Sequence, residues 1–179
     1  MKHFPFLPRL INESAFEDKG DDRMTEENLE RYIKLYRGTV FRLAYSIVQN
    51  REDSDDITQD AFMRLFISEQ TFLQEENVKA WLIRVTINLA KDLLRSGWRR
   101  HRAELTEDIP FESSREKVLL DSVKKLKTDH GIIVYLFYYE RYTVKEIAII
   151  RNTTPAAVRT KLTRARAQLR KMLSKEDLF

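Results

Sequence analysis

The chain has 179 residues, with 4 glycines, no cysteine and a formal net charge of +4. Charged residues make up 34% of it and hydrophobic residues 42%, which is typical of a globular protein and excludes a disordered one. The lack of cysteine excludes disulfides and thiolate metal sites, and His3, His101 and His130 are not spaced as metal ligands. We therefore expect neither a metal nor a cofactor.

The first 24 residues mix prolines, phenylalanines and charges without a helical period, and we interpret residues 1–24 as a flexible leader. Its opening MKHFPFLPRL is too short and too broken by proline for a signal peptide. The longest apolar run, residues 132–139, is far shorter than the roughly 20 residues that cross a bilayer. We expect a cytoplasmic protein.

Two amphipathic helices are predicted next, one from Thr25 to about Val48 and one from Asp53 onwards. The second would bury one apolar face and expose an acidic one that includes Asp56, Gln59, Asp60 and Met63. Acids in a first helical turn commonly complement the helix dipole, which accounts for Asp56 but not for Asp60. An acidic stripe of this kind also suits docking onto a basic partner helix. The residues alone leave both interpretations open.

A third helix is predicted from Val78, after a loop over residues 68–77. Along one flank of this helix Arg84, Asn88, Lys91 and Arg95 recur at steps of four, three and four. Such a flank offers cationic hydrogen-bond donors to DNA phosphates and one amide that can read a base. A solvated helix face would show the same pattern.

The acidic stretch ELTEDIPFESSR then indicates a linker, which we place at residues 103–115. Two short apolar helices follow it, and no strand alternation occurs anywhere. We predict an all-α fold of two small helical domains, residues 25–102 and 116–179, joined by a flexible linker.

A helix-turn-helix is predicted in the second domain. Thr143 and Glu146 have the spacing of a capping box, and Asn152 suits the left-handed turn that would end the first helix. Thr154 and Pro155 are typical of a second helix start. The polar face of this second helix carries Arg159, Thr160, Thr163, Arg164, Arg170 and Lys171.

Those side chains match the chemistry of a DNA major groove. Arginine can bridge guanine O6 and N7 or hold a phosphate, and threonine can contact base edges and the thymine methyl group. A solvated basic face on an ordinary core helix is the alternative. The capped helix and turn that precede it favour DNA recognition.

Together these segments resemble a known family, the sigma-70 factors of bacterial RNA polymerase, in the small extracytoplasmic-function form. RLAYSIVQNREDSDDITQDAFMRLF and VKAWLIRVTINLAKDLLRSGWRR resemble its region 2, and YLFYYERYTVKEIAIIRNTTPAAVRTKLTRARAQLRK resembles its region 4. The resemblance implies a promoter-specificity subunit that binds core polymerase without catalysing a reaction itself. Lys127 and Arg151-Asn152 depart from the family, which usually has a proline and a glycine at these places.

The resemblance also implies roles for particular residues. The polymerase clamp would meet the acidic helix of region 2, and the polymerase flap would meet region 4. Core polymerase binding would fall on Asp56, Gln59, Asp60, Met63 and Arg64. The −10 element, read as a single strand with a flipped base, would meet Phe72, Arg84, Asn88 and Lys91. The −35 element would meet Arg159, Thr160, Thr163 and Arg164. An anti-sigma factor, of a kind that is often membrane-anchored, would be a further partner.

Two other classes of protein fit the sequence less well. An ordinary dimeric helix-turn-helix regulator would use residues 25–100 for dimerisation or sensing, and would leave the acidic helix and the Arg84 flank without a role. A nucleic-acid hydrolase would need a phosphate loop, a nucleophile elbow or metal-ligand spacing, and the sequence has none of these motifs.

Overall fold

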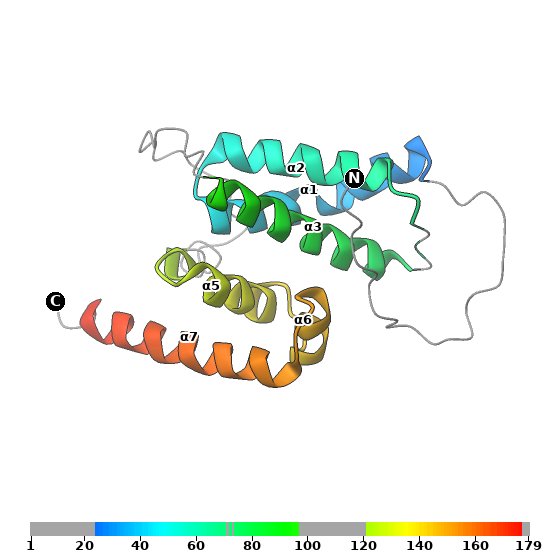
Figure 1. Cartoon of the computed structure of the whole chain (residues 1–179). Coiled ribbons are helices and arrows are strands. Elements are labelled where there is room, and N and C mark those ends of the chain that lie inside the picture. The colour runs from blue at the N-terminus through cyan, green and yellow to red at the C-terminus, as the bar shows by residue number, and fades with distance from the viewer. Residues whose placement is uncertain (1–23, 71, 73, 97–120, 177–179) are drawn as a thin grey trace.

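A computed structural model describes residues 24–70, 72, 74–96 and 121–176, and the described part consists of helices joined by short turns, without strands. Three long helices form one layer: α1 (Glu26–Val48), α2 (Arg51–Phe66) and α3 (Glu75–Arg95). The second layer contains α5 (Thr128–Val134), the π-helix η2 (Tyr135–Tyr139), α6 (Val144–Ile150) and α7 (Pro155–Glu176). Figure 1 shows the first layer above the second. The predicted leader and linker lie outside the described residues.

Side-chain caps define where the first two helices of the N-terminal module, α1 and α2, begin. Thr25 caps α1 by accepting a hydrogen bond from the Asn28 backbone N–H, and Asn50 caps α2 by accepting one from that of Asp53. Because Asn50 is the cap, α2 begins at Arg51, two residues before the predicted start. As predicted, α2 buries one apolar face, which consists of Ile57, Ala61, Phe62 and Leu65.

The helix-turn-helix of the C-terminal module has the predicted caps. Thr143 and Glu146 form the capping box, and the Thr154 hydroxyl accepts a hydrogen bond from the Ala157 N–H. Asn152 has φ 49°, the left-handed conformation for which the family usually has glycine and which asparagine tolerates. Lys127 has φ −58°, close to the value that a proline ring would impose. Both departures from the family pattern therefore preserve the backbone.

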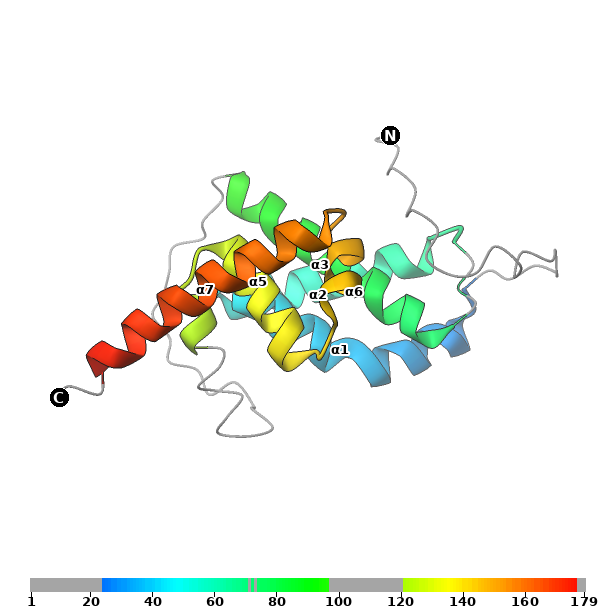
Figure 2. The same cartoon turned by 90° about the horizontal axis from the view of Figure 1, so that it is seen from below.

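The two modules share one hydrophobic core, whereas the sequence predicted two separate ones. Ile83, Ile87 and Ala90 of α3 are fully buried in the same cluster as Ile132 and Ile147 of the C-terminal module. A second, smaller cluster lies within the N-terminal module and takes the opposite face of α3. Helix α3 is thus covered on two sides, and Figure 2, seen from below, shows α5, α6 and α7 lying across α1, α2 and α3.

In the described residues, none of the helices has the length and apolar character that would let it cross a membrane.

Candidate nucleic-acid and polymerase interfaces

Helix α7 presents the four residues predicted to meet the −35 element on its solvent side. Arg159, Thr160, Thr163 and Arg164 are all exposed, while Val158, Leu162 and Ala165 on the opposite side are buried. Thr160 donates its hydroxyl hydrogen to the Ala156 carbonyl at 3.0 Å, so its methyl group and the acceptor side of its hydroxyl oxygen remain for base contacts. The face is continuous, polar and able to enter a major groove.

Asp129 of α5 accepts hydrogen bonds from two cationic side chains of the helix-turn-helix. One of its carboxylate oxygens accepts from Arg151 at 3.3 Å and the other from Lys161 of α7 at 3.4 Å. The Lys91 ammonium donates to it at 2.8 Å, and this hydrogen bond is the main reason why the Asp129 pKa is lowered. No local motif in the sequence marks Asp129 as a functional residue.

The predicted −10 flank of α3 lies partly against the C-terminal module. Arg84, Asn88 and Lys91 are all half-buried, and burial lowers the pKa of Arg84. The Arg151 pKa is also lowered, mainly because the side chain is buried. The carboxylate of Asp129 raises this pKa, and the positive charge of nearby Arg84 lowers it. The structure thus brings the three flank residues together on one side of α3, and that side faces the other module.

Phe72, the fourth residue predicted to meet the −10 element, contacts Trp81, which lies one helical turn before Arg84 on α3. Its ring packs edge-on against Trp81, with 5.9 Å between ring centroids, and joins the edge of the smaller hydrophobic cluster. Trp81 is itself only half-buried. Two aromatic rings at a module edge can serve as a stacking platform for a displaced base.

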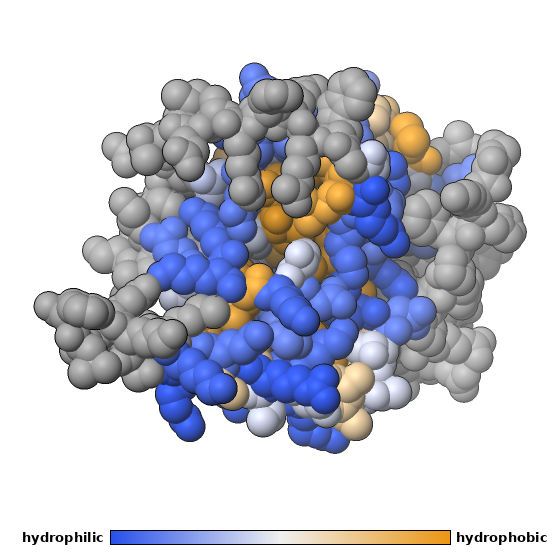
Figure 3. All heavy atoms as spheres, turned by 60° about the vertical axis from the view of Figure 1, so that its left-hand side comes forward, coloured by the Kyte–Doolittle hydropathy of each residue, from blue (hydrophilic) through white to orange (hydrophobic). Residues whose placement is uncertain are grey.

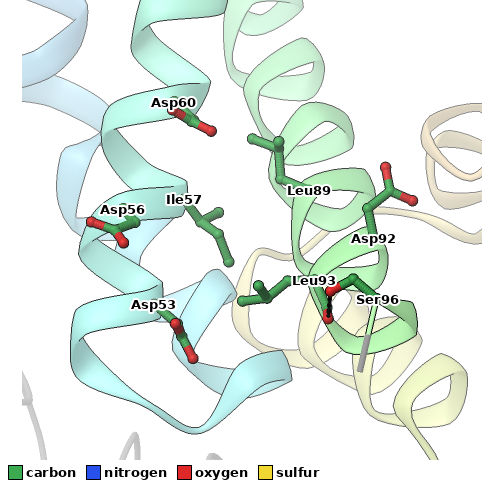
Figure 4. A pocket seen from close by; sticks show the side chains of 8 residues that line it. All are labelled: Asp53, Asp56, Ile57, Asp60, Leu89, Asp92, Leu93 and Ser96. Atoms are coloured by element: carbon green, nitrogen blue, oxygen red, sulfur yellow. Dashed lines mark hydrogen bonds between the residues drawn. The ribbon is translucent and has the colours of Figure 1, made fainter. Parts of the chain in front are cut away.

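An acidic groove lies between α2 and α3, with a volume of about 420 Å³. Its floor is made by Ile57, Leu89 and Leu93, and its rims carry Asp53, Asp56, Asp60 and Asp92. Figure 4 shows the apolar side chains pointing toward one another between the carboxylates of the two helices. The sequence predicted Asp56 and Asp60 on the acidic face of α2. It predicted neither Asp53 there nor Asp92, which α3 contributes and which pairs with Arg95.

The acidic face of α2 continues into an exposed apolar patch at the helix end. Met63 is 60% exposed and Ile67 is 67% exposed, with Phe66 beside them at 38%. Asp56, Gln59, Asp60 and Arg64 are exposed as predicted. Phe66 and Ile67 were missed, although their spacing of three and four residues from Met63 puts them on the same helix face. Figure 3 shows the opposite end of the molecule, on the left in Figure 1, where α2 begins and α3 ends; a separate apolar strip lies there between hydrophilic side chains.

Among the residues described, no group of three or more histidine, aspartate or glutamate side chains is placed to hold a metal ion. The four groove carboxylates line its rims and do not converge on a point.

Family models match both modules. The model for sigma-70 region 2 matches residues 32–100, and the model for sigma-70 region 4 matches residues 117–169. The chain is 31% identical over 160 residues to RNA polymerase sigma factor SigV of Bacillus subtilis, covering 86% of this chain and 96% of that protein. It is 29% identical over 177 residues to the ECF RNA polymerase sigma factor SigE of Mycolicibacterium smegmatis, covering 92% and 68% respectively.

Two solved structures share the fold. CnrH in complex with the cytosolic domain of CnrY matches with a TM-score of 0.65 at 23% identity, over 84% of this chain and 90% of that one. The sigma factor RpoE in complex with the anti-sigma factor NepR from Bartonella quintana matches with a TM-score of 0.64 at 17% identity, over 83% and 98%.

Proposed function

The chain belongs to the sigma-70 family of RNA polymerase sigma factors, in its extracytoplasmic-function group. From this premise we propose which surface of the chain binds each partner. A sigma factor directs promoter-specific initiation of transcription by RNA polymerase. In our proposal the C-terminal module binds the −35 element, the N-terminal module binds the −10 element, and α2 binds core polymerase. The chain itself supplies binding and melting, and the polymerase supplies the chemistry.

The observation that carries the −35 assignment is the exposed face of α7 on a fully capped helix-turn-helix. Arg159 and Arg164 are charged, solvent-facing and about one and a half turns apart, so both can reach a single stretch of major groove. Thr160 and Thr163 lie between them and offer methyl contacts to thymine. Asp129 holds the turn in place by pairing with Arg151 and Lys161.

We assign the −10 element to the α3 flank together with the aromatic pair of Phe72 and Trp81. Lys91 and Arg84 would hold phosphates, Asn88 would read a base edge, and the aromatic rings would stack on a base that has left the duplex. Flipping such a base costs a few kcal/mol, which stacking and amide contacts would offset. Recognition and melting of the element would then be one event.

The acidic groove and the exposed end of α2 are assigned to core polymerase. Carboxylates around an apolar floor suit a basic, amphipathic partner helix, because charge complementarity guides the encounter and apolar contact supplies affinity. Asp56, Gln59, Asp60 and Arg64 would form the polar rim, and Met63 the apolar contact. Region 4 would meet the polymerase flap, and the protein would work in the cytoplasm beside the chromosome.

An anti-sigma factor is the remaining proposed partner. Of the two solved structures described above, one is a sigma factor bound to an anti-sigma factor, and the other is CnrH bound to the cytosolic domain of CnrY. Exposed apolar surface at Met63 and Ile67 is available for such a protein to cover. Anchoring of that partner in a membrane would be tested by fractionating the cell after cross-linking.

Run-off transcription tests the whole assignment. The purified chain is added to bacterial core polymerase on a pool of genomic promoters, and we expect new transcripts that depend on both. Sequencing their 5′ ends would yield the two promoter elements at once. Failure to bind core polymerase, together with tight dimeric binding to a palindromic duplex, would instead make the chain a conventional regulator.

A further inference from the structure

The apolar patch at the end of α2 is left uncovered by the helices of the described part. Met63 and Ile67 are each more than half exposed, and Phe66 lies beside them with 38% of its surface exposed. The opposite side of the same helix is buried, at Phe62 and Leu65. Apolar side chains that gather in this way on a surface favour a partner that removes them from water.

The charges around the patch are mainly acidic. The exposed charged residues between positions 56 and 69 are Asp56, Asp60, Arg64 and Glu69. Asp60 lies one helical turn before Met63, so its carboxylate borders the patch on the same helix face. The first turn of α1, at the same end of the module, adds the exposed Glu26 and Glu27. An apolar segment that carries cations would complement this surface.

The first eleven residues of the chain, MKHFPFLPRLI, have this chemistry. They contain two phenylalanines, two leucines and an isoleucine, together with Lys2 and Arg9, and they contain no carboxylate. Pro5 and Pro8 disfavour a helix in this stretch, so an extended segment is the form in which it would meet a surface. Residues 1–11 therefore match the patch in both apolarity and charge.

The chain enters the described structure close to this patch. Helices α1 and α2 are joined by Gln49 and Asn50 and run antiparallel, so α1 begins at the end of the module where α2 finishes (Figure 1). Met24, just before α1, packs against the same cluster as Leu65. Residues 12–23 can span about 40 Å when extended, whereas α2, with 16 residues, is about 24 Å long. The first eleven residues can thus reach any part of α2.

Residues 12–23 have the opposite charge balance. They contain five carboxylates against Lys19 and Arg23, and they lead into the acidic first turn of α1 at Glu26 and Glu27. Repulsion between like charges disfavours docking of residues 12–23 at this end of the module. This stretch therefore suits a tether, and the first eleven residues suit the docking segment.

We propose that residues 1–11 dock on the apolar patch at the end of α2, with phenylalanine and leucine side chains over Met63 and Ile67 and with Lys2 and Arg9 near the α2 carboxylates. A tethered segment acts at a high effective concentration, so weak contacts suffice. The docked segment competes with core polymerase for Met63. This competition rests on the assignment of α2 to core polymerase, whereas the docking itself does not.

Oxidation of Met63 by hydrogen peroxide measures the docking in the full-length chain, because a thioether that is shielded from solvent reacts more slowly. The test protein is the double variant Phe4→Ser/Phe6→Ser. The matched control is Ala15→Ser/Phe16→Ser, which makes two substitutions in the tether instead. Peptide mass spectrometry follows Met63 at several protein concentrations. Both variants leave the described helices unchanged, so circular dichroism should match the wild type.

We expect Met63 to be oxidised about threefold more slowly, or slower still, in the wild type and in the tether control than in the Phe4/Phe6 variant. The difference should be the same at every protein concentration, because the segment and the patch belong to one chain. Equal rates in all three proteins would overturn the docking. Protection that grows with concentration would show that a second copy of the chain covers the patch, and would also overturn it.

Titration with core polymerase tests the competition. Protection of about threefold means that the patch is open about a third of the time, so the Phe4/Phe6 variant should bind core polymerase about threefold more tightly than the wild type. Equal affinities would overturn the competition. If none of the three proteins binds core polymerase, the assignment of α2 is wrong, and the oxidation rates still decide whether residues 1–11 dock.

Discussion

Replacing Arg164 with alanine should weaken binding to −35 duplex DNA and change its sequence preference. Arg164 is exposed and makes no ion pair within the described part of the chain, so the free energy of unfolding should change by less than about 0.5 kcal/mol. A bidentate arginine contact to guanine is worth about 1 to 3 kcal/mol. This range corresponds to a rise in Kd of about 5-fold to 160-fold.

Arg166 is the matched control for this substitution. It lies on the same helix and is also exposed, but its Nε donates to the Tyr138 hydroxyl at 2.8 Å and its guanidinium lies over the Phe137 ring at 5.6 Å. Arg166→Ala removes the same charge without removing a base contact. Fluorescence anisotropy on the best −35 duplex and on single-base variants would separate the two effects. Equal losses from both substitutions, or a uniform loss across sequences, would refute the base-reading role of Arg164.

Three other predictions concern the remaining surfaces. Asp60→Lys should reduce association with core polymerase in a pull-down while circular dichroism stays unchanged, whereas Glu69→Lys, an equal charge change outside the groove, should not; unaltered association of the Asp60 variant would contradict the docking role. Asn88→Ala should spare −35 duplex binding but impair promoter opening, and normal permanganate reactivity near the start site would count against it. The Asp129 pKa is lowered in the folded protein, so its ionised form stabilises the fold above the unfolded pKa near 4, and this stabilisation disappears as the pH falls through the folded value. Asp129→Asn should therefore be less stable than the wild type toward urea at pH 7 but equally stable in strong acid, and a constant difference across that range would exclude the ion pairs as its cause.

Local signals in the sequence determined the helices and the recognition face. Thr143, Glu146, Asn152, Thr154 and Pro155 each act on the backbone within a few residues, and the caps and the turn form where these residues predict them. Helical spacing likewise separates the buried and exposed sides of α2 and α7, because apolar residues at steps of three and four share one side of a helix.

Contacts between distant segments could not be predicted in this way. Ile83, Ile87 and Ala90 form a second apolar stripe on α3, beside the stripe of Val78, Leu82 and Val85 that packs within the N-terminal module. A second stripe signals that something covers it, but not what covers it.

The tertiary structure alone decided that the C-terminal module covers this stripe. It also decided that Asp129 is shared among Lys91, Arg151 and Lys161, and that Glu140 is buried against Lys79. These pairs join residues 22 to 61 positions apart along the chain, and they form only after the helices have packed together. Capping and helical periodicity are set within one or two turns, and the sequence displays them directly. The choice of which apolar helix faces pack together depends on their shapes and on the free energy of the whole structure. The packing of the two modules against each other is therefore determined only by the complete fold.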